Sequence, residues 1–311
     1  GQYQVHLADL TLDAPKRLVD ELALCTVTPC ALDLRRPDSV VAYVTSHRFD
    51  AVISSLPYFY NPAVADIARA HHLHYFDLTE DVAVTSRVKA ISEGADRAFL
   101  PQCGLAPGFI SIVTNDLIGH FEAIDNVKMR VGALPVHPSN ALKYSLTWST
   151  DGLINEYGNV CVGIEGGQEV QLRPLEGYET IELDGLLYEA FNTSGGLGTM
   201  CETMLGKVDN LDYKTMRYPG HMRLMNFFFH ELLMRERREE AGLILTHAKP
   251  PVDEDVVYVH VASEGEINGK LQRKEFVRAY YPIEVGGKRN TAIAWTTSAS
   301  VVSVICMVRD G

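Results

Sequence analysis

The sequence lacks the features that would take a protein into a membrane or onto a polyanion. It has no apolar run as long as a membrane span, so it predicts no transmembrane helix. Its N-terminus lacks the basic and then apolar profile of a signal peptide. Basic residues are scarce, since 28 lysines and arginines stand against 40 acidic residues and give a formal charge of −12. Nucleic acid and anionic lipid repel such a charge, so we expect neither as a partner.

The cysteine patterns of zinc sites and disulfide frameworks are also missing. The six cysteines are scattered and no two form a C-x-x-C pair, which favours reduced thiols in a cytoplasmic protein. His71, His72 and His74 lie close together, yet no Cys, Asp or second histidine pair completes a ligand pattern. We expect them at a helix end, where histidine favours the negative end of the dipole, and we expect no metal site.

What is present is an ordinary soluble composition in a chain long enough for two domains. Of 311 residues, 46% are hydrophobic and 22% are charged, which is average for a globular protein. We predict a first domain over residues 1–112, completed by a returning helix at 291–311. The second domain then covers residues 113–290.

The first hundred residues alternate short apolar runs with helical patterns. Strands are predicted at 5–8, 30–34, 50–55, 74–77 and 98–103. The helices between them begin at Asp13 and at Pro37, cover 61–70, and cover 81–93. Strand, helix, strand at this spacing is typical of a parallel, doubly wound α/β sheet of the Rossmann type.

After Gly108 the pattern changes to alternating segments with a few helices. Strands are predicted at 127–134, 142–148, 178–183, 187–191, 256–263 and 274–283, with a turn at Asn268-Gly269. Helices are predicted at 109–121, 197–205, 221–238 and 291–307. This order indicates an α+β domain built on a largely antiparallel sheet.

The end of the first predicted strand carries a residue suited to hold a dinucleotide. Asp9 ends this strand, and an acidic residue at such a position accepts hydrogen bonds from the adenosine ribose. It repels a 2′-phosphate, so we expect NAD as the cofactor, with NADP as the alternative. The G-x-G-x-x-G fingerprint stands about 20 residues before that acid, and only eight residues precede Asp9. We therefore expect the first strand and its phosphate loop to be missing from the sequence.

Two further strand ends are expected at the same edge of the predicted sheet as Asp9. Small residues at Ser54-Ser55-Leu56-Pro57 would let a cofactor approach the backbone, and the free N–H groups of Gly104-Leu-Ala-Pro-Gly108 favour an anion or a carbonyl oxygen. Both turns are also common at strand ends that bind nothing. The cofactor-binding candidates are Asp9, Leu10, Ser54, Ser55, Leu56, Pro57, Thr79, Gly104 and Leu105.

Six segments resemble, in order, the saccharopine dehydrogenase and lysine 6-dehydrogenase family. They are 75–81, 104–108, 148–157, 191–199, 214–221 and 291–298. Gly104-Leu-Ala-Pro-Gly108 is similar to the family's Gly-Leu-Asp-Pro-Gly element, and Lys214-Thr-Met-Arg-Tyr-Pro-Gly-His221 is close to its second-domain pattern. Ala106 stands where the family often has an acid, which leaves the catalytic carboxylate unassigned.

The resemblance implies an NAD(P)-dependent oxidoreductase that takes hydride from the C–N bond of a lysine-derived amine. Saccharopine or L-lysine would give 2-aminoadipate semialdehyde, in a cytoplasmic homodimer whose partner is a small amino acid. Such a reaction needs a base for the amine and for water, and a cation for the substrate carboxylates. The sequence does not separate the two substrates.

Several polar residues of the second domain fit these roles, each with a structural alternative. For the carboxylate clamp we predict Arg217 or Arg223 with Thr193 and Ser194 beside them, although either arginine could instead form an internal salt bridge. For acid–base chemistry the candidates are His221, Asp151, Lys143 and Asp81. His221 titrates closest to neutrality, whereas the two aspartates could serve only as helix caps and Lys143 could lie at the surface.

Two other functions remain open on the sequence. One is a family member without catalytic activity that serves as a binding or scaffold protein, suggested by the missing phosphate loop and by Ala106. The other is a dehydrogenase of a different amine on the same frame, such as carboxynorspermidine.

Overall fold

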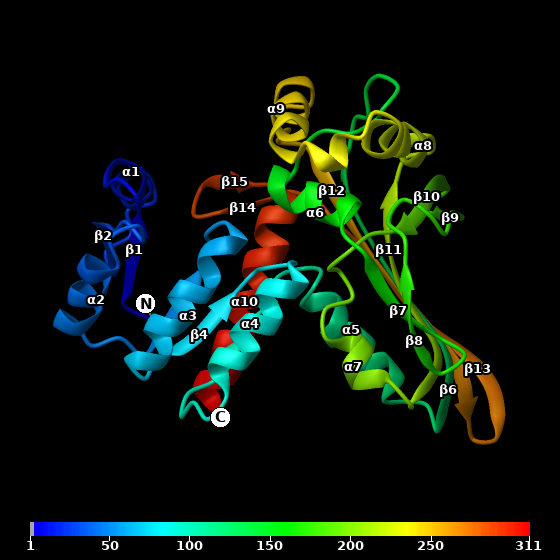
Figure 1. The fold of residues 1–311 in the computed structure, drawn as a ribbon, viewed down its shortest axis with the longest axis horizontal. Helices are drawn as coiled ribbons and strands as arrows, with labels where there is room; N and C mark the ends of the chain where they lie inside the picture. The colour runs from blue at the N-terminus through cyan, green and yellow to red at the C-terminus, as the bar shows by residue number, and fades with distance from the viewer. Residues whose placement is uncertain (1–2) are drawn as a thin grey trace.

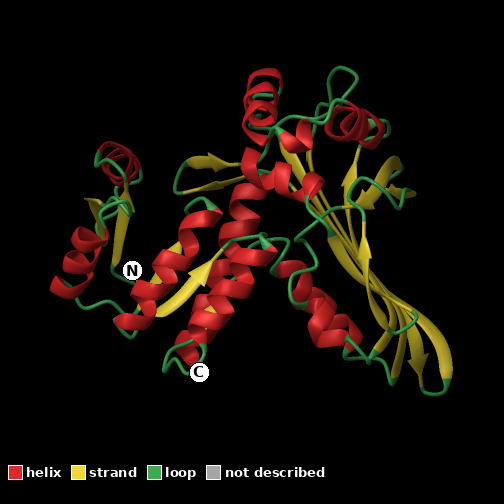
Figure 2. Cartoon of the chain, in the orientation of Figure 1, coloured by secondary structure: helices red, strands yellow, loops and turns green. Residues whose placement is uncertain are grey.

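The structure, a computed structural model, describes residues 3–311. Figure 1 shows two parts, with the N-terminal strands and helices in blue and cyan on one side and a long sheet in green and orange on the other. Figure 2 shows that helices lie between the two sheet regions. The α/β first half and the mixed second half confirm the predicted fold class.

The first half consists of short parallel strands with helices between them. The strands are β1 (Val5–Asp9), β2 (Val27–Ala31), β3 (Ala51–Ser54), β4 (His74–Asp77) and β5 (Phe99–Leu100). The helices are α1 (Asp13–Glu21), α2 (Pro37–Ser46), α3 (Asn61–Ala70) and α4 (Val82–Ser92). Prolines in the first turn begin α2 and α3, where a missing N–H costs nothing. Asp81 begins α4 by accepting a hydrogen bond from the Val84 amide.

The parallel sheet of this half is in two pieces. Strand β1 pairs with β2, and β3, β4 and β5 form a second sheet. The apolar side chains of Val5 on β1 and Ile53 on β3 are 42% and 47% exposed. At the carboxyl ends of the same two strands, Asp9 and Ser55 are exposed as well, so these ends lie at the surface of the first half.

The second half is built on one eight-stranded sheet. Its strands are β6 (Ala123–Pro135), β7 (Cys161–Glu165), β8 (Gln168–Leu172), β9 (Glu179–Leu183), β10 (Leu186–Asn192), β11 (Val208–Arg217), β12 (Asp255–Ile267) and β13 (Lys270–Tyr280). The main order is β13-β12-β6-β11-β10-β9, and β7 and β8 extend from β11. Only β6 and β11 pair in parallel, so the largely antiparallel character is confirmed.

Helices and a small hairpin complete this half. The helices are α5 (Phe109–Ile118), α6 (Thr150–Gly158), α7 (Met200–Met204), α8 (His221–Asn226), α9 (Arg238–Ala248) and α10 (Ala292–Asp310), and the hairpin is β14 (Ile283–Val285) with β15 (Lys288–Asn290). Every second residue of β6 and β12, including Met129 and Val259, joins α5 and α7 in the main apolar core. Burying such a side chain stabilises the fold by about 1.5–3 kcal/mol.

Helix α10 connects the two halves. At its start, the Asp255 carboxylate accepts hydrogen bonds from the amides of Ala292 and Ile293. At its middle, Val301 packs with Phe76 of β4. By length and composition this helix alone, among residues 3–311, could cross a membrane, yet it packs against both β4 and β12. Its other side is exposed, with Val302 at 51% and Met307 at 69%.

The structure corrects several predicted elements. Residues 142–148 do not form a strand, because Lys143 has a φ of +49° and no partner strand pairs with the segment. Tyr144 and Leu146 are nevertheless buried, since the segment packs against α6 and α9 rather than in a sheet. The predicted helix 221–238 is broken by a π turn and by Leu233 in the left-handed region. Strands β7, β8 and β11 were not predicted.

Candidate functional site

A loop of the first half inserts into the second half just after β4. Glu80 lies in this loop, and two glycines make room for it. A Cβ on Gly195 would lie 2.4 Å from the Glu80 carbonyl oxygen, and a Cβ on Gly152 would lie 2.9 Å from Glu80 Oε1. A larger residue at Gly195 would push against the loop backbone, whereas at Gly152 its Cβ would first meet the Trp148 ring, 2.2 Å away. The sequence therefore builds a close contact between the halves at Glu80.

A hydrogen-bonded chain holds the same contact from the side. Asn155 on α6 donates from Nδ2 to Asp81 Oδ2 at 3.3 Å and accepts at Oδ1 from Arg238 of α9 at 2.8 Å. Asp81, predicted as a catalytic candidate, therefore caps α4 and also joins the two halves.

The next residue of α6, Glu156, is buried at this junction. Its backbone carbonyl accepts a hydrogen bond from the Ser194 amide, which brings Thr193 and Ser194 beside it. Its Oε2 atom is buried without a hydrogen bond, as is Thr193 Oγ1. Arg217 Nη2 lies 3.6 Å from Oε2, which is long for a hydrogen bond. The carboxyl thus has an ion-pair partner and an unfilled acceptor position.

The pKa values of both glutamates are raised, so each side chain loses its proton less readily than an exposed glutamate does. Burial raises the pKa of Glu156 to about 7 against the pull of Arg217, and the Glu80 charge raises it further. Burial likewise raises the pKa of Glu80 to about 7, with help from the Asp81 charge. Glu80 Oε1 is buried and has no hydrogen bond. Carboxyls of this pKa exchange protons readily near neutral pH.

Arg217 is the last residue of β11 and is only 2% exposed. Its Nε donates to the Tyr157 hydroxyl at 3.0 Å, and its Nη1 donates to Thr215 Oγ1 and to the Met216 carbonyl. The guanidinium is therefore held rigidly by groups of β11 and α6.

His221 continues the hydrogen-bonded chain that starts at Arg217. Its Nε2 lies 2.9 Å from the Tyr157 hydroxyl, and its Nδ1 lies 3.1 Å from the Leu142 carbonyl. Because a carbonyl can only accept, this network assigns the proton to Nδ1 and makes Tyr157 the donor to Nε2. Burial, followed by the nearby Arg217 charge, lowers the pKa of His221 to about 3. The imidazole is neutral and fully bonded at physiological pH.

The structure brings some of the predicted second-domain residues together and leaves others apart. Thr193, Ser194, Arg217 and His221 converge around α6, and Asp81 reaches the same helix. Asp151 and Arg223 are exposed, and Lys143 donates to the Pro219 carbonyl at 3.4 Å. The roles of these side chains stay predictions.

Sequence reasoning missed Glu80 and Glu156. The available signals were local: Glu80 follows a strand end, and Glu156 lies between the buried residues Ile154 and Tyr157. Neither signal shows that two chain segments close over the carboxyls.

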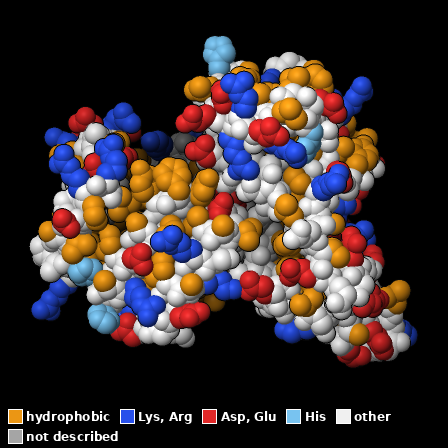
Figure 3. Space-filling model, in the orientation of Figure 1, with side chains coloured by type: hydrophobic (Ala, Val, Ile, Leu, Met, Phe, Trp, Pro, Cys, Tyr) orange, Lys and Arg blue, Asp and Glu red, His pale blue; other side chains and the backbone are white. Residues whose placement is uncertain are grey.

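The predicted cofactor residues lie at the carboxyl ends of the first-half strands, where ligands of parallel sheets bind. Asp9 and Leu10 at the end of β1 are exposed, as are Ser55 and Leu56 after β3. Ser54 is buried and donates to Asn61 Oδ1. Thr79, Gly104 and Leu105 are buried nearer the second half. Hydrophobic side chains are visible over this half, at the left of Figure 3.

These residues fit the adenosine end of a dinucleotide. An exposed carboxylate at the end of β1 can accept hydrogen bonds from ribose hydroxyls, and the open strand ends beside it leave room for a flat base. The sequence contains no G-x-G-x-x-G run, so no residue of it is assigned to the pyrophosphate. Among residues 3–311 no group of side chains could hold a metal ion.

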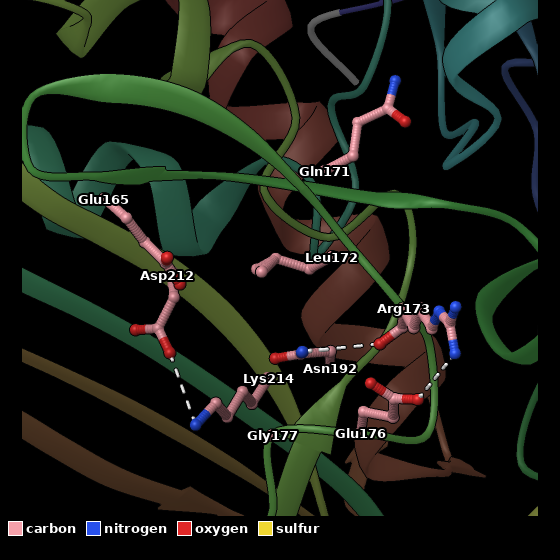
Figure 4. A pocket seen from close by; sticks show the side chains of 9 residues that line it. All are labelled: Glu165, Gln171, Leu172, Arg173, Glu176, Gly177, Asn192, Asp212 and Lys214. Carbon is pink, nitrogen blue, oxygen red and sulfur yellow. Dashed lines mark hydrogen bonds and ion pairs between the residues drawn. The ribbon is translucent and has the colours of Figure 1, made fainter.

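A pocket lies elsewhere, on the face of the sheet that carries Asp212 and Lys214. It has a volume of about 420 Å³ and is lined by Glu165, Gln171, Leu172, Arg173, Glu176, Gly177, Asn192, Asp212 and Lys214 (Figure 4). Side chains alternate along a strand, so Asp212 and Lys214 face away from Arg217 on β11. Lys214 lies 3.5 Å from Asp212 and 2.9 Å from Glu179. Its charge is already paired, so the pocket contributes nothing to the junction site.

Two family models match almost the whole chain. One, described as the saccharopine dehydrogenase NADP binding domain, matches residues 1–98. The other, described as the saccharopine dehydrogenase C-terminal domain, matches residues 104–311. The boundary between them lies just before the Gly104 turn.

Two solved structures share the fold. Apo saccharopine dehydrogenase (L-Glu forming) from Saccharomyces cerevisiae has a TM-score of 0.70 at 14% identity, over 99% of this chain and 91% of that chain. The homospermidine synthase from Legionella pneumophila, in complex with NAD, has a TM-score of 0.60 at 14% identity, over 98% of this chain and 78% of that chain. At such low identity the likeness concerns the fold.

Proposed function

Because the chain belongs to the saccharopine dehydrogenase family, we propose that it is an NAD(P)-dependent dehydrogenase of a lysine-derived amine. Saccharopine or L-lysine is oxidised at the C–N bond, and hydrolysis of the imine gives 2-aminoadipate semialdehyde. The observation that carries the proposal is the junction, where buried carboxyls and a buried arginine meet beneath the strand ends of the cofactor half.

The charges at the junction suit an amino-acid substrate. Two carboxyls attract the substrate's cationic nitrogen, and burial strengthens this attraction because little water screens it. Arg217, with Thr193 and Ser194 beside Glu156, offers donors for a substrate carboxylate. Arg223, exposed on α8, is the other candidate clamp for the carboxylate.

The reaction balances with one hydride and one proton. For L-lysine, the aminium, NAD(P)⁺ and water give the aldehyde, ammonium, NAD(P)H and one proton. NAD(P)⁺, when bound, accepts the hydride. The chain's own residues must take the proton from nitrogen, keep the reacting carbon in position and admit one water.

His221 acts in this proposal by positioning. Its neutral ring accepts the hydrogen bond from Tyr157, and Tyr157 in turn accepts one from Arg217. This chain fixes the guanidinium beside Glu156. Asp151 and Lys143 remain candidate acid–base residues.

An amine without carboxylates is the second candidate substrate. Most Arg217 donors are already used within the protein, while both glutamates have unfilled acceptor atoms. Homospermidine synthase, which shares the fold, shows that the frame can belong to a polyamine enzyme. Carboxynorspermidine and diamines therefore belong in the same assay.

The test is a substrate screen on the purified protein. NADH and NADPH binding is followed by fluorescence, and L-lysine, saccharopine, carboxynorspermidine and putrescine are assayed with NAD⁺ and NADP⁺ by absorbance of the reduced cofactor. We expect nucleotide binding and turnover of L-lysine or saccharopine. Nucleotide binding without turnover of any amine would contradict the proposal and favour a binding protein.

A further inference from the structure

We infer that Glu80 and Glu156 share one proton and together form the acid–base group of the amine oxidation. The inference rests on the proposed function for its role in catalysis, but the shared proton is a property of the protein alone. It concerns two residues that no sequence pattern singled out. The argument depends on where the two side chains lie, on their missing hydrogen bonds and on the charges around them.

The two carboxyls are neighbours across the junction. Glu80 Oε1 lies 2.9 Å from the position of a Cβ on Gly152. Gly152 and Glu156 are four residues apart on α6, so they lie one above the other on the same face of the helix, with Cβ positions about 5–6 Å apart. The loop that closes over them also links them, since Ser194 binds the Glu156 carbonyl and Gly195 packs on the Glu80 carbonyl.

Both carboxyls have an oxygen that is buried and unbonded. Leaving a buried acceptor unsatisfied costs about 1–3 kcal/mol, and here Glu80 Oε1 and Glu156 Oε2 are both in this state. The Glu156 side chain is only 8% exposed. A proton on one carboxyl, and a substrate nitrogen that bridges the two, would satisfy both atoms.

The surrounding charges balance only one of the two carboxylates. Arg217 is the cation that acts on Glu156, while Glu80 faces the further negative charges of Asp81 and Asp77. The other titratable groups near Glu156 are Tyr213, Tyr157, Tyr144 and Cys161. Burial raises the pKa of each of these four, so they stay neutral. Two like charges and one cation in a buried space favour a single shared proton.

The chemistry follows from this arrangement. The ionised oxygen of the pair takes the proton of the substrate N–H bond, and the electron pair left on nitrogen forms the C=N bond as hydride leaves carbon. Water adds to that carbon and releases one proton to solvent, and the protonated carboxyl returns its proton to nitrogen. The C–N bond then breaks as the new hydroxyl gives its proton to the leaving nitrogen, which departs as ammonium from L-lysine or as glutamate from saccharopine. The pair is thus deprotonated once and protonated once in each turnover.

The first test needs no substrate. Infrared difference spectra of the full chain, recorded between about pH 5 and 9, report the carbonyl band of protonated carboxyls. We expect one band that titrates near pH 7 in the wild type and in the surface control Glu239→Gln. The band should be lost or moved in both Glu80→Gln and Glu156→Gln. Spectra that are unchanged in the two variants would overturn the inference.

The second test uses kinetics with L-lysine, saccharopine and NAD⁺. The wild type should show an acidic limb in its kcat profile near pH 7. Glu156→Gln should lower kcat by about 10²–10⁴-fold, with a smaller change in KM, and should remove that limb. Glu→Gln retains the shape of the protonated carboxyl, and thermal unfolding of each variant confirms that it folds.

The two failures can be told apart. If no amine is oxidised but the infrared band behaves as expected, the proposed function fails and the shared proton stands. If an amine is oxidised while both Gln variants keep kcat and the wild-type pH profile, the function stands and the pair is wrong.

Discussion

The two halves of the molecule differ in how continuously their sheets are paired. The second half has eight connected strands, and it contains most of the largest fully buried side chains, including Arg130, Arg217 and Phe229. The first half has two small parallel sheets, and apolar residues on β1 and β3 are exposed. The second half can therefore hold charged groups in a buried and rigid arrangement. The first half offers open strand ends to a large ligand.

The largest change in stability is expected at Arg217, in the second half. Replacing Arg217 with Ala leaves the Glu156 carboxylate buried without its cation, and we expect a loss of about 3–5 kcal/mol in unfolding free energy. Arg223→Ala, at an exposed position, should change it by less than about 0.5 kcal/mol. Denaturant unfolding measures both. Equal losses would mean that the second half does not depend on the buried pair.

Kinetics of the same two variants decide which arginine binds the substrate carboxylate. If Arg217 is the clamp, Arg217→Ala should raise the KM for the amino acid by about one or two orders of magnitude. An unchanged KM in that variant, with a raised KM in Arg223→Ala, would assign the clamp to α8.

The pH dependence of stability tests whether the second half holds the Glu156 carboxyl buried and protonated. The pKa of Glu156 rises from 4.5 to about 7 on folding, so the folded state holds a proton that the unfolded state has released. The contribution of Glu156 to stability should then fall between about pH 4.5 and 7, by about 1.4 kcal/mol per pH unit. Glu156→Gln lacks this proton, so its stability relative to the wild type should rise by about 3 kcal/mol across that window. Parallel curves of unfolding free energy against pH would contradict this.

The contact between the halves can be tested with two glycines. Gly195 and Gly206 have φ values of +89° and +74°, so Ala is strained at either position. Only at Gly195 would the new Cβ meet a backbone atom, the Glu80 carbonyl oxygen at 2.4 Å, whereas it meets nothing within 4 Å at Gly206. We expect Gly195→Ala to lose about 1–3 kcal/mol more than Gly206→Ala in denaturant unfolding. Equal effects would show that the loop can move away from Glu80 without cost.

The smallest expected effect lies in the open first half. Replacing Asp9 with Ser removes a carboxylate that opposes a 2′-phosphate, and we expect the preference for NADH over NADPH to fall by about tenfold, or about 1.4 kcal/mol. Fluorescence titration with both nucleotides measures the ratio. Asp20→Ser, farther along α1, is the matched control and should leave the ratio unchanged. An unchanged ratio in Asp9→Ser would remove this residue from the adenosine site.

Local chemistry explains which parts of the fold could be predicted. Helix α3 begins where Pro62 follows Asn61, and α4 begins at the Asp81 cap, because helix starts depend on a few adjacent residues. Strand β11 was missed because its Asp212 and Lys214 look like surface residues. They are tolerated there because Arg130 and Glu179, from other strands, pair with them.

In the site, too, the features that depend on adjacent residues could be predicted and those that depend on distant contacts could not. Thr193, Ser194 and Arg217 were predicted from their segments, and the structure brings them together. His221 was chosen because histidine titrates near neutrality, but burial lowers its pKa to about 3. Glu80 and Glu156 titrate near neutrality instead, since two halves of the chain close over them. That property arises from distant contacts and leaves little trace in the neighbouring sequence.

The attachment of α10 has a mechanical consequence. Its start is pinned to the Asp255 carboxylate, and its 19 residues extend about 28 Å to the sheet that contains β4. A lever of that length magnifies small rotations, so a tilt of about 5° at the pinned end shifts the far end by about 2.5 Å. A slight adjustment at Asp255 would therefore move the far end of α10 by more than the length of a covalent bond.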